Sequence, residues 1–128
     1  MKAIVIKADM SFYEQNVTFE DVRKIVGGYV TATYPRHHSM KGLVVLVDED
    51  GLMKRLPDND LASIICCTPL VGDAVIVRNG GEDFLSLTHQ DVFDIKKILT
   101  ELKEVYGRKS ETSVRHGRKR TLRTAKGS

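Results

Sequence analysis

Residues 43–56 read LVVLVDEDGLMKRL, and this stretch carries the strongest fold signal in the chain. The aliphatic run Leu43 to Val47 is typical of a buried β-strand, because its side chains can fill both faces of a sheet. The residues that follow, Asp48 to Gly51, are ones that form tight turns. The stretch therefore predicts a hairpin in which residues 52–56 form a second, antiparallel strand.

Three other segments show the alternating, β-branched pattern of strands, at residues 2–7, 29–34 and 74–77. Residues 84–87 are a candidate to pair back against the last of these, because Asn79-Gly80-Gly81 supplies a turn between the two. The sequence therefore predicts a sheet of about five short strands.

Two short helices are expected between the strands. Thr18 and Asp21 form a capping-box pair, in which each side chain binds a free backbone N–H at the helix start. This helix ends at Gly27-Gly28, since glycine adopts the left-handed geometry of a helix end without strain. Residues 61–67 are expected to form one or two helical turns that stop before Pro69.

The last core element is a long amphipathic helix that begins after a second capping-box pair, Thr88 and Asp91. Its apolar positions recur at helical spacing and form one stripe. They are Val92, Ile95, Ile98, Leu99, Leu102 and Val105. Phe93 lies off the centre of this stripe, where it is a candidate dimer contact, and Gly107 is the expected end of the helix.

These elements predict an α+β domain over residues 1–106, built on one mainly antiparallel sheet of about five short strands. One short N-terminal helix and one long C-terminal amphipathic helix complete the domain, and we expect both to lie across the same face of the sheet. Residues 107–128 contain too few apolar side chains to build a second core, so we expect a disordered tail there.

Charge is divided between these two parts. Residues 107–128 contain eight Lys or Arg and a single acidic residue, Glu111, whereas residues 1–106 contain 12 basic and 16 acidic residues. An acidic body is therefore joined to a basic tail that is suited to nucleic acid or an acidic partner. Its contact residues would be Arg108, Lys109, Arg115, Arg118, Lys119, Arg120, Arg123 and Lys126. Because no aromatic residue follows Tyr106, the contacts would be with phosphates and would weaken in salt.

Cysteine usage and hydropathy exclude several protein classes. Cys66 and Cys67 are adjacent, which suits neither a mutual disulfide nor the spaced pairs of a zinc site, so we expect two buried, reduced thiols. No apolar run approaches the roughly 20 residues of a membrane helix, and residues 1–9 lack a secretory cleavage site. We therefore expect a cytoplasmic protein without a metal or cofactor.

Three ordered blocks of sequence resemble a known family. They are IVGGYV at residues 25–30, VDEDGLMKRLPDND at residues 47–60 and LVGDAVIV at residues 70–77. In this order they are similar to a family of small proteins from bacteriophages and related mobile elements, catalogued as a domain of unknown function. Family members carry an Asn in the turn after the Leu-Pro pair, and in this chain Asn59 is close to that sequence position. The resemblance covers residues 1–87 and implies a phage or prophage origin, but it supplies no catalytic residues.

The remaining candidate site residues are basic and acidic loop positions. Arg36, His37, His38 and Lys41 form a cationic loop that suits an anionic ligand or a partner protein. The run Asp48 to Asp50 fits a solvated turn better than a cation site, because it lacks the ligand spacing of a calcium hand. An enzyme that pairs a histidine of this loop with an aspartate of that run is the weaker alternative.

These observations favour a non-enzymatic accessory protein of a phage or prophage that acts by binding. It would inhibit a host factor or sequester an anionic nucleotide. The alternative is a nucleic-acid-binding regulator that uses the basic tail and forms a homodimer through the sheet edge or the last helix.

Overall fold

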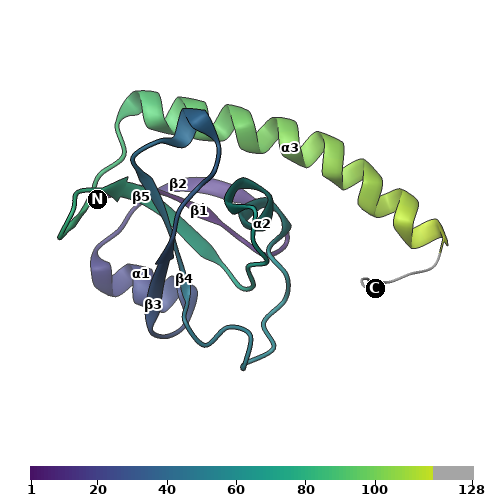
Figure 1. The fold of residues 1–128 in the computed structure, drawn as a ribbon, viewed down its shortest axis with the longest axis horizontal. Coiled ribbons are helices and arrows are strands. Elements are labelled where there is room, and N and C mark those ends of the chain that lie inside the picture. The colour runs from purple at the N-terminus through teal and green to yellow at the C-terminus, as the bar shows by residue number, and fades with distance from the viewer. Residues whose placement is uncertain (117–128) are drawn as a thin grey trace. The chain divides into compact units, whose positions relative to one another are not determined.

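The computed structural model describes the backbone of residues 1–116 and the side chains of residues 1–107. It divides into a unit of residues 1–97 and a second unit that starts at Ile98. Figure 1 shows the elements in chain order. Their bounds are β1 Lys2–Ile6, β2 Phe12–Asn16, α1 Phe19–Val26, β3 Val30–Thr33, the 3-10 helix η1 His38–Met40, β4 Leu43–Asp48, α2 Asp60–Cys66, β5 Ala74–Asn79, β6 Phe84–Leu85 and α3 His89–His116.

The described strands form one antiparallel sheet in the order β2-β1-β5-β4-β3, with β6 paired to the end of β5. Ile76 of β5 lies opposite Ile4 of β1 on one side and opposite Val45 of β4 on the other. The three central strands are therefore the most buried ones. The predicted α+β class, the mainly antiparallel sheet and the C-terminal helix are confirmed.

Strand β2 has no counterpart among the predicted strands. Its sequence, Phe-Tyr-Glu-Gln-Asn, has two strand-favouring aromatic residues but no β-branched ones, and its partly buried side chains do not alternate, so its strand signal is weak. It forms because the chain reverses directly after β1, where the Lys7 N–H donates to Ser11 O and Met10 adopts a left-handed backbone with φ of 76°. This turn lays β2 along β1, with Phe12 opposite Ile6.

The sheet is buried on both faces. Val77 of β5 points into a cluster with Val22 of α1. Because side chains alternate along a strand, Ile76 and Arg78 point to the opposite face, where Ile76 is fully buried. The Arg78 guanidinium binds the Asp91 carboxylate of α3 there, at 2.6 and 3.0 Å. The first turns of α3 therefore lie on the face opposite α1.

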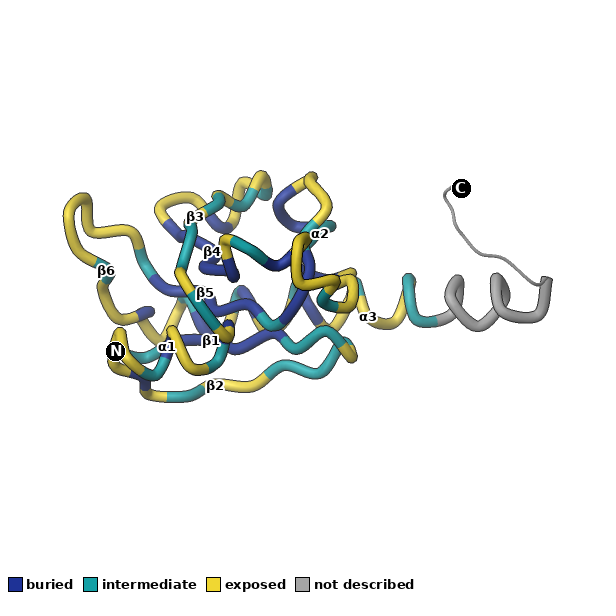
Figure 2. Tube along the Cα trace, turned by 90° about the horizontal axis from the view of Figure 1, so that it is seen from below, coloured by how far each residue is buried: buried dark blue, intermediate teal, exposed yellow. Residues whose placement is uncertain are grey.

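The expectation that the first and last helices share one face of the sheet is thus wrong. An aliphatic run such as Leu43 to Val47 has no solvent side, so each face of the sheet needs its own cover. Figure 2 shows the central strands as a dark-blue buried layer within teal and yellow surface segments.

Residues 52–56 do not form the second strand of a hairpin, and β4 pairs with β3 and β5 instead. The Asp48 carboxylate accepts the Asp50 N–H at 2.8 Å and binds Lys54 Nζ at 2.7 Å, which folds the segment back onto the end of β4. Leu52 and Met53 are left 75% and 85% exposed. The turn residues predict where the chain reverses, but not that a side chain will capture the returning segment.

The helices α1 and α2 follow their sequence signals. Thr18 and Asp21 form the capping box of α1, and Gly27 ends it with φ of 93°. Helix α1 follows two strands, β1 and β2, so it is not the first element of the chain. The predicted fold class named one short helix, whereas the described residues form α2 as well as α1. Cys66 is buried, but Cys67 ends α2 in a left-handed conformation and is exposed, so only one of the two predicted core thiols is in the core. Burial raises the pKa of the Cys66 thiol to about 11.

Helix α3 begins as predicted and ends later than predicted. The Asp91 N–H donates to Thr88 Oγ1 at 3.0 Å and the Thr88 N–H donates to the Asp91 carboxylate at 2.9 Å. The helix passes through Gly107 and continues to His116, because a glycine costs a helix interior only about 1 kcal/mol and no proline follows. Phe93 is 63% exposed. The domain boundary at residue 106 and the disordered tail stay predictions, and residues 117–128 lie outside the described residues.

Candidate functional site

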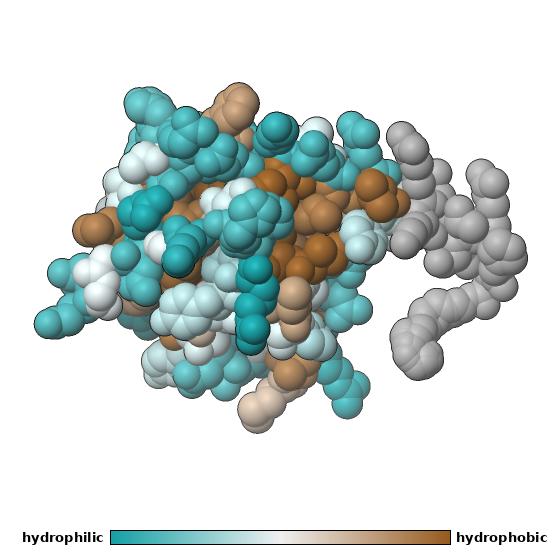
Figure 3. Space-filling model, turned by 45° about the horizontal axis from the view of Figure 1, so that its top comes forward, coloured by the Kyte–Doolittle hydropathy of each residue, from teal (hydrophilic) through white to brown (hydrophobic). Residues whose placement is uncertain are grey.

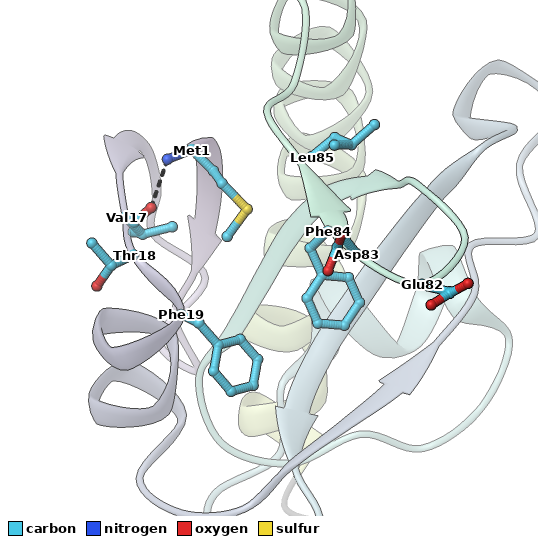
Figure 4. Close-up of a pocket in the computed structure, with 8 residues that line it drawn as sticks. All are labelled: Met1, Val17, Thr18, Phe19, Glu82, Asp83, Phe84 and Leu85. Atoms are coloured by element: carbon cyan, nitrogen blue, oxygen red, sulfur yellow. Dashed lines mark hydrogen bonds between the residues drawn. The ribbon is translucent and has the colours of Figure 1, made fainter.

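An open groove of about 710 Å³ lies at the end of the sheet where β1 starts. Its lining residues come from three segments of the chain: Met1, Val17, Thr18, Phe19, Glu82, Asp83, Phe84 and Leu85. Figure 4 shows the Phe19 ring, from the start of α1, and the Phe84 ring, from β6, beside the same space. The two rings stack with their centroids 6.1 Å apart.

Hydrogen bonds hold both walls of the groove in place. The Met1 amino group donates to Val17 O at 2.7 Å, which fixes the start of β1 against the segment that leads into α1. The Gly80 N–H donates to Asp83 O at 2.9 Å and closes the turn before β6. The Lys2 N–H donates to Ser86 Oγ at 3.0 Å and ties the two walls together. The groove therefore belongs to the folded framework.

The groove has an apolar interior and an acidic rim. Phe84 packs against the buried cluster on the α1 side of the sheet, while Phe19 and Leu85 are 48% and 49% exposed. Glu82 and Asp83 are exposed in the turn before β6, and Figure 4 shows the Glu82 carboxylate pointing away from the two rings. Such a lining suits an apolar side chain accompanied by positive charge, and it opposes a phosphate.

Exposed apolar side chains are not confined to the groove. In Figure 3, apolar side chains (brown) reach the surface among polar ones (teal) on the face shown. Most scattered exposed apolar residues need no explanation, but a half-exposed Phe19 ring that stacks on Phe84 in a preformed groove is a typical contact for a partner.

Sequence patterns alone do not reveal the groove, because its walls come from segments far apart in the chain. The signal that the sequence offers is a phenylalanine beside a helix cap or a turn in two of these segments. Phe19 follows the helix cap Thr18, and Phe84 follows Gly80-Gly81 and two acidic residues. At such positions a large ring has little of its own element to cover it.

The predicted ligand loop of Arg36, His37, His38 and Lys41 joins β3 to β4. Arg36, His38 and Lys41 are exposed and His37 is half-buried. His37 Nδ1 accepts the Ser39 N–H at 3.1 Å, and the His37 and His38 rings stack with centroids 4.6 Å apart. The structure brings the four residues together in one loop, but none of them lines the groove. Their role in binding an anion stays a prediction.

The histidines of this loop do not meet the acidic run Asp48 to Asp50. The two lie at opposite ends of β4, whose six residues span about 20 Å. The Asp48 carboxyl is also already engaged. Burial alone would raise its pKa, but the bonds from Lys54 and from the Asp50 N–H outweigh burial and hold the pKa below its ordinary value. Asp48 is therefore a structural anion, and the weaker enzyme alternative loses this residue.

The blocks that carry the family resemblance converge at this far end of the sheet. We call the cluster of Asp48, Lys54, Asn59 and Gly72 the motif corner. Asn59 is fully buried, and its side-chain amide donates to Ile6 O at 3.0 Å and to Gly72 O at 2.8 Å. Its side-chain oxygen accepts the Ala62 N–H at 3.1 Å and so caps α2. These contacts are internal, so the conspicuous residues of the blocks fix the fold.

The predicted basic contact residues lie mostly beyond the described part of the chain. The backbone of α3 includes Arg108, Lys109 and Arg115. The others, Arg118, Lys119, Arg120, Arg123 and Lys126, lie outside the described residues. Contact with nucleic acid or an acidic partner through this segment stays a prediction.

Two classes of site are missing from the described residues. Among them, no three His, Cys, Asp or Glu side chains are grouped so that they could hold a metal ion. None of the helices in the described part combines the length and the apolar content that a membrane crossing requires.

Comparison with known proteins identifies a family. The model of a family described as "Domain of unknown function (DUF3846)" matches residues 1–103. The match reaches beyond residues 1–87, the range covered by the resemblance of the three sequence blocks, into α3. No curated protein and no solved structure matches the chain.

Proposed function

We propose that this chain, which belongs to the DUF3846 family, is a non-enzymatic binding protein that inhibits a host factor by capturing a segment of it. The observation that supports this proposal is the groove, which is lined by the stacked Phe19 and Phe84 rings and by Glu82 and Asp83. From the resemblance of its sequence blocks, we also propose that the chain is an accessory protein of a phage or prophage.

The lining of the groove defines the chemistry of the captured segment. An apolar or aromatic side chain placed against Phe19 and Leu85 would remove their exposed surface from water. A neighbouring Arg or Lys would pair with Glu82 or Asp83 at the rim and stack on a phenylalanine ring. An anionic nucleotide would meet these carboxylates unfavourably, so we favour a protein partner over a nucleotide.

The test uses a labelled decapeptide with a central Phe-Leu pair flanked by arginines, whose binding is followed by fluorescence anisotropy. We expect saturable binding that weakens as salt is raised, because part of the attraction is between charges at the rim. The same peptide with glutamates in place of the arginines should bind at least about tenfold more weakly. Equal binding of the two peptides would contradict the proposal.

Two variants locate the binding. Glu82→Lys together with Asp83→Lys should weaken binding of the arginine peptide at least about tenfold, because both residues are exposed and the reversed charges repel the peptide. Leu52→Ser together with Met53→Ser is the control, since these residues are more exposed than Phe19 and Leu85 of the groove but lie at the other end of β4. The control should bind the peptide as tightly as the parent chain does.

The non-enzymatic role is tested by incubating the chain with a panel of nucleotides and measuring product. Release of several product molecules per chain would contradict this role.

A second candidate function, nucleic-acid binding through the basic tail, is favoured by the division of charge along the chain. Residues 107–128 hold eight of the 20 Lys and Arg. Binding to a 20-base-pair DNA duplex should then fall steeply between 50 and 200 mM salt, by at least about tenfold if three or more phosphates are contacted. A chain that ends at Tyr106 should lose this binding, and unchanged affinity would exclude the tail.

A further inference from the structure

The two edges of the sheet differ in how well they are protected against pairing. The edge strand β2 carries Glu14. Its carboxylate oxygens lie 3.8 Å from Lys2 Nζ and 3.8 Å from Lys96 Nζ. Charge at an edge discourages the approach of another strand. The other edge strand, β3, reads Val-Thr-Ala-Thr and has no charged residue, proline or bulge. Among the described residues, no strand covers its outer side.

The register of β3 with β4 shows which backbone groups face outward. Tyr29 O accepts the Glu49 N–H, and Thr31 and Thr33 lie opposite Val47 and Val45. In an antiparallel pair, only every second residue bonds to the partner strand. The backbone N–H and C=O groups of the odd-numbered residues in this segment therefore face β4. The N–H and C=O groups of Val30, Ala32 and Tyr34 face outward.

We propose that β3 is the interface for a second copy of this chain, with the two β3 strands paired antiparallel about a two-fold axis at Ala32. In this register Ala32 lies opposite Ala32 of the second copy, and Val30 lies opposite Tyr34. The three outward-facing residues of each copy are then bonded, and one continuous sheet runs through both copies.

The side chains fit this register on both faces. Val30 and Tyr34 share one face, where Tyr34 is 55% exposed and Val30 is packed at the border of the core. An aromatic residue opposite a β-branched one is a favourable cross-strand pair. On the other face Thr31 lies opposite Thr33, and threonine pairs of this kind are also favourable. No like charges are brought together within the paired segment.

The first test is the mass of the chain in solution, measured by size-exclusion chromatography with light scattering over a range of concentrations. We expect twice the chain mass of 14.4 kDa. Ala32→Lys should raise the dimer dissociation constant at least about tenfold, because each new lysine lies opposite its own copy at the axis. Tyr13→Lys on β2 is the matched edge-strand control and should leave the dimer intact. A single-copy mass throughout, or an equally stable dimer in Ala32→Lys, would overturn the proposal.

The second test fixes the register. In a Cys67→Ser background, which removes the exposed thiol, Ala32→Cys should form a disulfide-linked dimer under mild oxidation, since residue 32 meets itself at the axis. Thr31→Cys should not, because Thr31 lies opposite Thr33. Circular dichroism of each variant confirms that it is folded. Cross-linking of Thr31→Cys without Ala32→Cys would overturn the proposed axis.

Discussion

The motif corner and the groove lie at opposite ends of the same sheet and use their polar residues in opposite ways. In the motif corner, Asp48 and Asn59 are buried and their side chains bond to other parts of the chain. At the groove, Glu82 and Asp83 are exposed at the rim of an apolar hollow. Residues that stand out in the sequence therefore stabilise the fold, while the surface best suited to a partner is built from inconspicuous ones.

The largest expected effect comes from Asn59→Ala in the motif corner. The substitution leaves Ile6 O, Gly72 O and the Ala62 N–H without their partner in a buried site, so we expect a loss of about 3–5 kcal/mol in the free energy of unfolding. Urea unfolding followed by circular dichroism measures it. Asn16→Ala, at an exposed position, is the control and should change stability by less than about 0.5 kcal/mol. A similarly small loss for Asn59→Ala would remove the distinction between the two ends.

The next effect concerns Asp48 and depends on pH. Because the pKa of its carboxyl is lowered in the folded state, the carboxylate stabilises the fold above its ordinary pKa of 3.8, and this contribution is lost as the pH falls through the lower folded pKa. Asp48→Asn should cost about 1–3 kcal/mol at pH 7. Its stability should also fall less steeply than that of the parent chain below about pH 4. Parallel acid profiles in urea unfolding would show that Asp48 does not act as an anion.

A smaller effect on stability is expected at the groove. Phe19→Ala removes a ring that is already half exposed and stacks on Phe84, so we expect a loss of about 1 kcal/mol. Its affinity for the arginine peptide should nevertheless fall at least about tenfold, because the ring forms one wall of the groove. Stability from urea unfolding and affinity from anisotropy are compared on the same sample. A large stability loss with unchanged affinity would assign Phe19 to the core.

The smallest effect tests the end of α3. Gly107→Ala should stabilise the helix by about 0.5–1 kcal/mol, because Gly107 is a helix-interior residue with no atom within 4 Å of an added Cβ. The helical signal at 222 nm in circular dichroism should rise slightly. If Gly107 were instead the left-handed end of the helix, alanine would be strained there and the signal would fall.

Local signals in the sequence predicted local structure well. The caps at Thr18, Asp21, Thr88 and Asp91 and the aliphatic run of β4 were correctly read, because each depends on neighbours within a few residues. Errors arose where distant contacts decide the outcome. The predicted hairpin is absent because β3 and β5 pair with the two sides of β4, and β2 forms after the turn that follows β1 although Glu14 and Asn16 are residue types depleted in strands. The groove needed both Phe19 and Phe84, whose meeting depends on the whole sheet.

The central claim is that this chain acts by holding a partner in the groove, and backbone amide chemical shifts test it most directly. The isotope-labelled chain is titrated with the arginine-flanked Phe-Leu peptide. We predict saturable shifts at residues 17–19 and 82–85, with residues 48–59 of the motif corner unchanged. Shifts confined to the loop of residues 36–41, or no shifts at peptide concentrations that saturate the anisotropy signal, would contradict the account.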